Sequence, residues 1–136
     1  MVLVDTSAWI EFDRGTDSPV ALKLRGLVDE GSSIASTEPV LMEMLGGTRG
    51  DRAAHEVRRL LTSFEWISAD ATADFEGAAR IYRACRAVGV EPGGYVDCMI
   101  AAIALRTDAE ILTTDSGFER IAEVFPLRLM QVDSGT

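Results

Sequence analysis

The chain has 136 residues, of which 47% are hydrophobic, and it carries a formal net charge of −9 at pH 7. This length and hydrophobic content suit one compact domain with a buried core, and two domains would be too many for the chain. The acidic balance argues against a broad basic surface for nucleic acid, although carboxylates that converge on a divalent cation would neutralise part of this charge locally.

Short apolar runs alternate with helical patterns along the chain. The runs predict strands over residues 2–4, 33–36, 64–69, 110–114 and 127–132. Helices are expected between these strands, over residues 7–12, 19–30, 38–46, 51–63, 70–88, 96–106 and 115–124. Strands separated by helices predict a three-layer α/β fold, in which helices flank a central, mainly parallel sheet of about five strands. We expect this fold to be a single domain over residues 1–136.

Several helix ends carry recognisable signals. Ser18 suits an N-cap position, Pro19 the first helical position and Gly31 the stop of the second helix. Thr37 is expected to cap the third helix, which should close at the pair Gly46 and Gly47. These signals place the third helix directly after the second strand.

The helix over residues 96–106 is apolar nearly all round, which predicts a central position in the fold. Its apolar run, Met99 to Leu105, is far shorter than a membrane span. The N-terminus also lacks the basic and apolar arrangement of a signal peptide. We therefore expect a cytoplasmic protein that has no membrane partner.

Thiol and imidazole chemistry have little support. Cys85 and Cys98 lack CxxC spacing and are expected to be small buried hydrophobic residues. His55, the one histidine, lies in a charged segment and is expected on a solvated helix face. A single histidine excludes HExxH metal sites and leaves any Ser-His-Asp triad dependent on His55 alone.

Four carboxylates stand at positions where α/β folds form sites. Asp5 and Asp115 end two predicted strands, and the carboxyl ends of parallel strands share one edge of the sheet. Asp97 opens the most apolar helix, and Glu43 lies inside the helix that follows the second strand. We therefore expect Asp5 and Asp115 to lie at the same edge of the sheet, and we consider the four acids together as a candidate cluster.

Each carboxylate also has a simpler explanation, since Asp5 and Asp115 could cap helices, Asp97 could complement a helix dipole and Glu43 could be solvated. Jointly, however, two carboxylates about 4 Å apart repel each other by roughly 4 kcal/mol at an effective dielectric constant of 20. A cluster of them favours a cation, and all-oxygen ligands select Mg²⁺ or Mn²⁺.

Four segments together resemble the motif blocks of PIN-domain ribonucleases, specifically the VapC-type toxins of bacterial toxin-antitoxin pairs. These segments are LVDTSAWIEF, TEPVLMEMLGG, YVDCMIAAIAL and ILTTDSGFERI, which span residues 2–121. The resemblance implies a PIN fold and metal-dependent endonucleolytic cleavage of RNA, such as tRNA or rRNA, with Mg²⁺, or Mn²⁺ in its place. It also implies homodimers and a VapB-like antitoxin partner, and its metal ligands and catalytic residues would be Asp5, Glu43, Asp97 and Asp115.

Some positions allow more than one interpretation. Thr6 or Ser7 matches a hydroxyl that the family often has near the site, but a helix N-cap explains either equally well. Gly117 stands where the family often has a second aspartate, so a fifth carboxylate is missing here. The segment around the first helix could form an exposed hydrophobic surface or part of the core, through Trp9, Ile10 and Phe12.

Arginines are the candidates for RNA contacts. Arg80, Arg83 and Arg86 follow each other at intervals of three along one predicted helix, where they could equally form a solvated face paired with Glu76. Arg14 and Arg49 are expected in loops near the first two motif blocks.

Proteins of other classes fit less well. A receiver domain needs a lysine late in the chain, whereas the one lysine is Lys23. A haloacid-dehalogenase-type phosphotransferase needs an aspartate at the position of Ser7. A catalytically inactive PIN-like binding module is the remaining alternative, and it would be expected to lack some of the four acids.

Overall fold

A central parallel sheet organises the computed structural model, which describes residues 1–132. Four strands hydrogen-bond in the order β3-β2-β1-β4. They are short: β1 (Val2–Val4), β2 (Ile34–Ser36), β3 (Glu65–Trp66) and β4 (Glu110–Leu112). All three strand pairs are parallel, and the register of β1 and β4 places Val4 beside Leu112. The residues that follow β1 and β4 therefore leave the sheet side by side.

The expected fifth strand does not form, so the prediction of about five strands is wrong by one. Over residues 127–132 the chain makes only one β-bridge, between Ile111 and Leu129. The Ile111 N–H donates to the Arg128 carbonyl, and the Met130 N–H donates to the Ile111 carbonyl. Residues 127–132 thus follow the edge of β4 at one position, while β1 occupies the other edge of β4 over three residues.

Seven helices among residues 1–132 flank the sheet. They are α1 (Thr6–Asp13), α2 (Pro19–Asp29), α3 (Glu38–Gly46), α4 (Asp51–Thr62), α5 (Ala73–Ala87), α6 (Tyr95–Thr107) and α7 (Ser116–Ala122). Ser18 caps α2 as predicted, because its side chain accepts a hydrogen bond from the Ala21 N–H and Pro19 follows it. Thr37 precedes α3 but makes no side-chain capping hydrogen bond.

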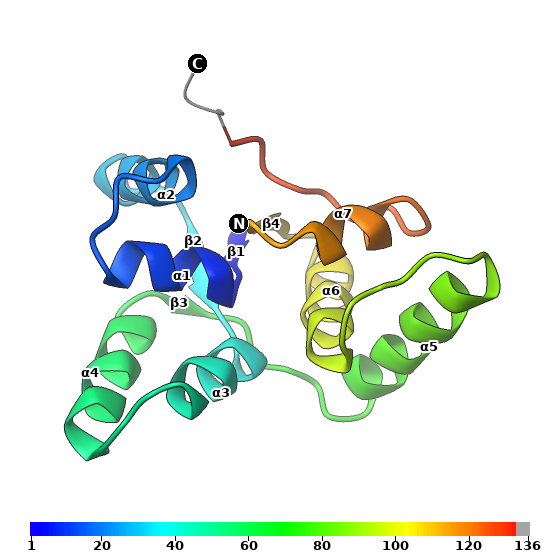
Figure 1. The fold of residues 1–136 in the computed structure, drawn as a ribbon, viewed down its shortest axis with the longest axis horizontal. Helices are drawn as coiled ribbons and strands as arrows, with labels where there is room; N and C mark the ends of the chain where they lie inside the picture. Colours follow the sequence, from blue (N-terminus) through cyan, green and yellow to red (C-terminus); the bar gives the residue numbers. More distant parts are fainter. Residues whose placement is uncertain (133–136) are drawn as a thin grey trace.

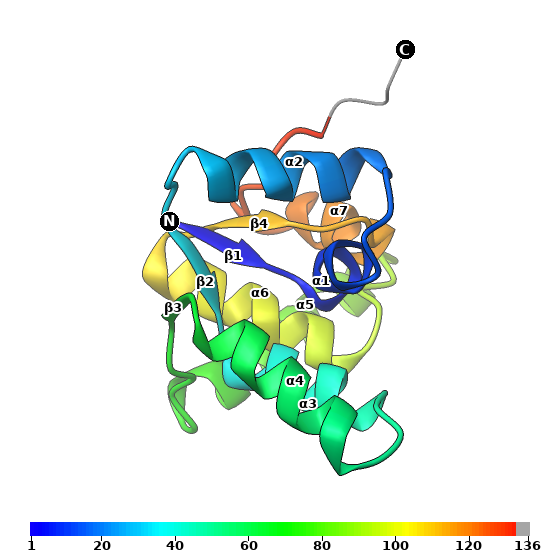
Figure 2. The same ribbon diagram turned by 90° about the vertical axis from the view of Figure 1, so that its left-hand side faces the viewer.

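The helices form two layers around the sheet (Figure 1). The second view shows α2 and α7 above the strands and α3, α4, α5 and α6 below them, while α1 lies at the end of β1 (Figure 2). Helix α6 is central, as its composition predicts, and Ile100, Ala101 and Ile103 are fully buried. These layers give the three-layer α/β fold expected from the sequence.

The core absorbs residues whose place the sequence left open. Trp9 is fully buried and packs against Phe12 and Phe64, which are partly buried, so this region belongs to the core. Cys85 and Cys98 are both buried and free, as expected. His55 is exposed on α4.

No helix within residues 1–132 is both long and apolar enough to cross a membrane. The prediction of one domain over residues 1–136 includes residues 133–136, which lie outside the described part of the chain.

Candidate active site

Asp5 and Asp115 stand at the carboxyl ends of the neighbouring strands β1 and β4. The Asp5 N–H donates to the Leu112 carbonyl at 2.9 Å, which extends the pairing of the two strands by one step. Both aspartates are also helix N-caps: Asp5 accepts a hydrogen bond from the Ser7 N–H, and Asp115 from the Gly117 N–H. Capping and a place at the sheet edge are therefore compatible roles for both residues.

Two hydroxyl groups hold the Asp5 carboxylate. Ser7 Oγ and Thr113 Oγ1 each donate to Asp5 Oδ2 at 2.8 Å. Each hydroxyl in turn accepts a backbone N–H, Ser7 from Thr114 and Thr113 from Asp115. Since the backbone occupies the acceptor side of each hydroxyl, its single proton is free for Asp5.

Asp5 is 3% exposed, the most buried of the four predicted carboxylates. Burial raises its pKa, while the hydrogen bonds from Ser7 and Thr113 lower it, and the net result is a raised pKa. The carboxylate is thus fixed in orientation and costly to ionise without a nearby positive charge.

Glu43 reaches the same region from α3. Thr6 Oγ1 donates to Glu43 Oε1 at 2.7 Å, which ties α1 to α3. Burial raises the pKa of Glu43, and the charges of Asp5 and Asp115 raise it further. The hydroxyls of Thr6 and Ser7 therefore both contact predicted site carboxylates. Neither residue is the N-cap of α1, because Asp5 occupies that position.

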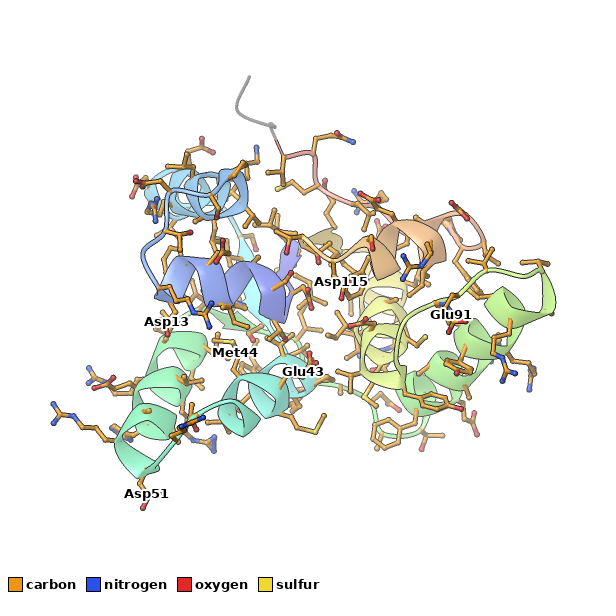
Figure 3. The ribbon with its side chains drawn as sticks, viewed as in Figure 1. Asp13, Glu43, Met44, Asp51, Glu91 and Asp115 are labelled. Carbon is orange, nitrogen blue, oxygen red and sulfur yellow. The ribbon has the colours of Figure 1, made fainter. Side chains whose placement is uncertain are left out.

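Asp97 lies in the first turn of α6 and brings the fourth carboxylate. Its pKa is raised to about 7, first by burial and then by the charges of Asp115, Asp5 and Glu43. Figure 3 shows Glu43 and Asp115 facing the region between α1 and α3 on one side and α6 and α7 on the other. The structure therefore brings all four predicted carboxylates together.

Two glycines make room for this cluster. Gly93 has a φ of +80°, and a Cβ on it would lie 2.8 Å from Asp97 Oδ2. A Cβ on Gly117 would lie 3.2 Å from Asp115 Oδ1 and 3.5 Å from Asp97 Oδ2. Both aspartates thus pack against backbone that carries no side chain.

Within residues 1–132, no three acidic, cysteine or histidine side chains are arranged closely enough around one point to hold a metal ion. The carboxylates instead bind hydrogen-bond donors of the protein: Glu43 binds Thr6, Asp115 binds the Gly117 N–H, and Asp5 binds two hydroxyls. Glu43 and Asp115 are exposed, whereas Asp5 is buried.

The PIN domain family model matches residues 2–124 of the chain. Ribonuclease VapC11 from Mycobacterium tuberculosis and VapC ribonuclease Mb1587 from Mycobacterium bovis are each 40% identical to it over 129 residues, which cover 94% of this chain and 96% of each relative. The chain belongs to the VapC family of PIN-domain ribonucleases. The VapBC2 structure from Rickettsia felis, bound to a DNA fragment from its promoter, has the same fold, with a TM-score of 0.75 at 19% identity, and covers 98% of this chain and 100% of that one.

Gly117 is the point at which this VapC protein departs from the pattern described above. A side chain there would start 3.5 Å from Asp97 Oδ2, so an aspartate would bring a fifth negative charge directly into the cluster. Glycine avoids that charge, and its N–H donates to Asp115 Oδ1 at 2.8 Å. The position still serves the cluster, through its backbone.

Sequence reasoning missed Thr113 and Gly93. The parallel register of β1 and β4 would have placed Thr113 beside Asp5, but it requires knowing that these two strands are neighbours. The contact of Gly93 depends on the turn of the loop before α6, and the run of two glycines there is its only signal in the sequence.

Gly93→Ala is expected to lower the rate of RNA cleavage by about 10²-fold, because the new methyl group would displace the Asp97 carboxylate. The left-handed backbone at this position would add about 1–2 kcal/mol of strain. Gly94→Ala is the matched control, since a Cβ at Gly94 meets nothing within 4 Å. Equal activity of the two variants, measured at equal folded fraction, would contradict this role of Gly93.

Proposed function

We propose that this chain is a metal-dependent endoribonuclease, a toxin that cuts RNA phosphodiester bonds and is neutralised by a VapB-like antitoxin. The main support for this proposal is the gathering of four carboxylates, in which burial and mutual repulsion raise the pKa of Asp97 to about 7. Its VapC relatives are named ribonucleases, which supports the same activity. The alternative, an inactive binding module, would have no use for this costly arrangement.

The donor atoms of the cluster suit a divalent metal ion, although the four side chains would have to draw closer together to bind one. All four side chains offer oxygen, and neither histidine nor thiolate lies among them, which favours a hard cation such as Mg²⁺, or Mn²⁺ in its place. Asp5 and Asp97 would bind the ion directly, and Glu43 and Asp115 would bind it or orient water. When bound, such an ion lowers the pKa of a coordinated water and neutralises charge on the phosphate oxygens.

The side chains of the protein contribute position and proton transfer. The hydroxyls of Ser7 and Thr113 fix Asp5, so its carboxylate keeps one orientation through the reaction. The hydrogen bond from Thr6 positions Glu43 and lowers its pKa, but burial and the charges of Asp5 and Asp115 outweigh it. The resulting raised pKa makes Glu43 a better acceptor for the proton of an attacking water. Asp115, held by the Gly117 N–H, would orient the water or the phosphate from the side of α7.

Purified, antitoxin-free protein is expected to cut total RNA in the presence of Mg²⁺ or Mn²⁺, and EDTA is expected to stop the cutting. The physical reason is that the four acids repel the phosphate of the bond to be cut unless a cation compensates their charge. The products are resolved by gel electrophoresis, and calorimetry with Mn²⁺ measures metal binding separately.

A matched control removes one acidic charge elsewhere. Asp51 is exposed at the start of α4 and lies far from Asp115 in Figure 3. Asp51→Asn is expected to cut RNA as the wild type does. Cutting that persists in EDTA would exclude the metal mechanism, and Mn²⁺ binding without any cutting would favour the inactive binding module.

A groove beside Glu43 offers a place for the antitoxin. It has a volume of about 230 Å³ and lies between α1, α3 and α4. Its lining combines apolar side chains, among them Ile10 and Met44, with two acidic side chains, Asp13 and Glu43, and one basic side chain, Arg14. Asp13, Glu43 and Met44 are labelled in Figure 3. An antitoxin segment that carries both basic and apolar residues would complement this lining in an acidic protein. We further propose that the toxin forms a homodimer, as the family resemblance implies.

A further inference from the structure

Helix α5 and the start of α6 carry a patch that the proposed mechanism leaves unused. It consists of two tyrosines and two arginines, Tyr82, Arg83, Arg86 and Tyr95, here called the tyrosine–arginine patch. These four side chains, with Ala79 and Ala87, line a groove of about 470 Å³. Among residues 1–132, no acidic side chain lines this groove, although the chain as a whole carries a net charge of −9.

The two tyrosines form a stack with one anchored end and one exposed end. Their ring centroids are 4.4 Å apart, with an angle of 20° between the ring planes. Tyr82 packs against the hydrophobic core, and the guanidinium of Arg86 lies 5.5 Å from the centroid of its ring. Tyr95 is 61% exposed. An exposed ring held on a rigid stack is a platform on which another planar group can stack.

The guanidinium groups of Arg83 and Arg86 are available to bind an anionic ligand. Arg83 and Arg86 are exposed, and neither forms an ion pair within the described part of the chain. The alternative interpretation, in which the arginines of α5 pair with Glu76, does not hold among residues 1–132. The three arginines of α5 also separate, because Arg80 lines a different groove, beside Asp74 and Arg106. Two unpaired guanidinium groups thus flank the tyrosine stack.

The patch also adjoins the carboxylate cluster through α6. Tyr95 is the first residue of this helix, and Asp97 lies two residues later, about 3 Å further along the helix axis. Residues two apart project from different sides of a helix, so Tyr95 turns toward Tyr82 on α5 while Asp97 turns toward the cluster. A single strand of nucleic acid that passes the start of α6 can therefore contact both Tyr95 and Asp97.

We infer that the tyrosine–arginine patch binds the single-stranded RNA segment next to the bond that is cut, with a base stacked on Tyr95 and phosphates on Arg83 and Arg86. This inference rests on the proposed function. Aromatic platforms combined with arginines bind single strands largely without regard to sequence. The patch would thus supply the positive potential that a protein with a charge of −9 otherwise lacks.

The test measures the binding of a fluorescein-labelled pool of single-stranded RNA 12-mers of mixed sequence by fluorescence anisotropy, in EDTA to prevent cutting. Tyr95→Ala is expected to weaken binding about 10-fold or more, and Tyr95→Phe to bind as the wild type does. Arg83→Ala is expected to reduce the slope of log Kd against log salt concentration by about 0.7. Arg58→Ala, an exposed arginine of α4, is the matched control and should leave affinity unchanged.

Cleavage of total RNA in Mg²⁺ by the same proteins separates the two proposals. A wild type that neither binds nor cuts RNA would overturn both of them. A wild type that cuts RNA, with Tyr95→Ala and Arg83→Ala binding and cutting equally well, would overturn only the role of the patch. Size-exclusion chromatography of the same proteins reports their oligomeric state. Variants that keep RNA affinity but elute at a different volume from the wild type would show that the patch is a protein interface instead.

Discussion

Asp97→Asn is expected to lower the rate of metal-dependent RNA cleavage by about 10²–10³-fold, the usual loss when one group that stabilises charge in the transition state is removed. The same substitution is expected to stabilise the metal-free protein. Asp97 is surrounded by Asp5, Glu43 and Asp115, and burial and their charges raise its pKa to about 7. A neutral amide of the same shape removes this repulsion, and each kcal/mol of relief would raise Tm by about 4 °C.

The effect on stability should depend on pH in a definite direction. The folded protein holds the Asp97 proton up to about pH 7, whereas the unfolded chain releases it near the ordinary value of 3.8. Between these values the folded state binds more protons, so the contribution of Asp97 to stability falls as the pH rises from about 4 to 7. A metal ion would reverse the effect at neutral pH, because it favours the ionised carboxylate.

Thermal unfolding of the wild type and Asp97→Asn at pH 5.5 and pH 8, each with EDTA and with Mg²⁺, would test this prediction. The variant should gain most at pH 8 in EDTA and should respond least to Mg²⁺. Asp51→Asn is again the control, and it should not gain stability, since Asp51 lies favourably in the first turn of α4. An Asp97→Asn protein that is less stable than the wild type in EDTA at pH 8 would contradict the repulsion argument.

The proximity of the four acids could be predicted from the sequence, for two of them from topology and for the other two with the help of the family resemblance. Asp5 and Asp115 follow apolar runs, and parallel strands end at a common edge, so their proximity follows from topology alone. Glu43 and Asp97 lie on helices, and their placement needed the resemblance to PIN-domain proteins as well. The roles of these four residues remain predictions.

Features that depend on side-chain packing were not accessible from the sequence. The segment over residues 127–132 has a strand-like pattern, yet it pairs with β4 at a single position, between Ile111 and Leu129. Spacing alone placed Arg80 with Arg83 and Arg86, but the packing of α5 against α6 divides them between two grooves. Periodicity shows which face of a helix is apolar, and tertiary contacts decide what lies beside the polar one.

An ion pair between the buried carboxylate of Asp74 and the 37% exposed side chain of Arg106 fixes α6 to α5 and to the segment before it. Asp74 is 1% exposed, and its carboxylate accepts hydrogen bonds from Arg106 Nε at 2.9 Å, from Arg106 Nη2 at 2.8 Å and from the Asp70 N–H at 2.7 Å. Arg106 also donates to the Ser68 carbonyl. Burial would raise the pKa of Asp74, but the hydrogen bonds from Arg106 and Asp70 outweigh it, and the pKa is lowered. This contribution to stability is therefore present at neutral pH and is lost as the pH falls below 3.8 through the folded-state pKa.

Arg106→Met is accordingly expected to lower the free energy of unfolding by about 3 kcal/mol at pH 7, because it leaves the buried carboxylate of Asp74 without its partner. Arg128→Met is the matched control: the ion pairs of Arg128 with Asp108 and Glu110 are exposed, and their loss should cost less than about 1 kcal/mol. Urea unfolding of both variants measures the difference. Equal losses would mean that the Asp74–Arg106 pair contributes no more than a surface ion pair.

The same substitution should also affect activity. Asp97 lies on the same helix as Arg106, so a loosened α6 should lower RNA cleavage, even at urea concentrations where the protein is still folded.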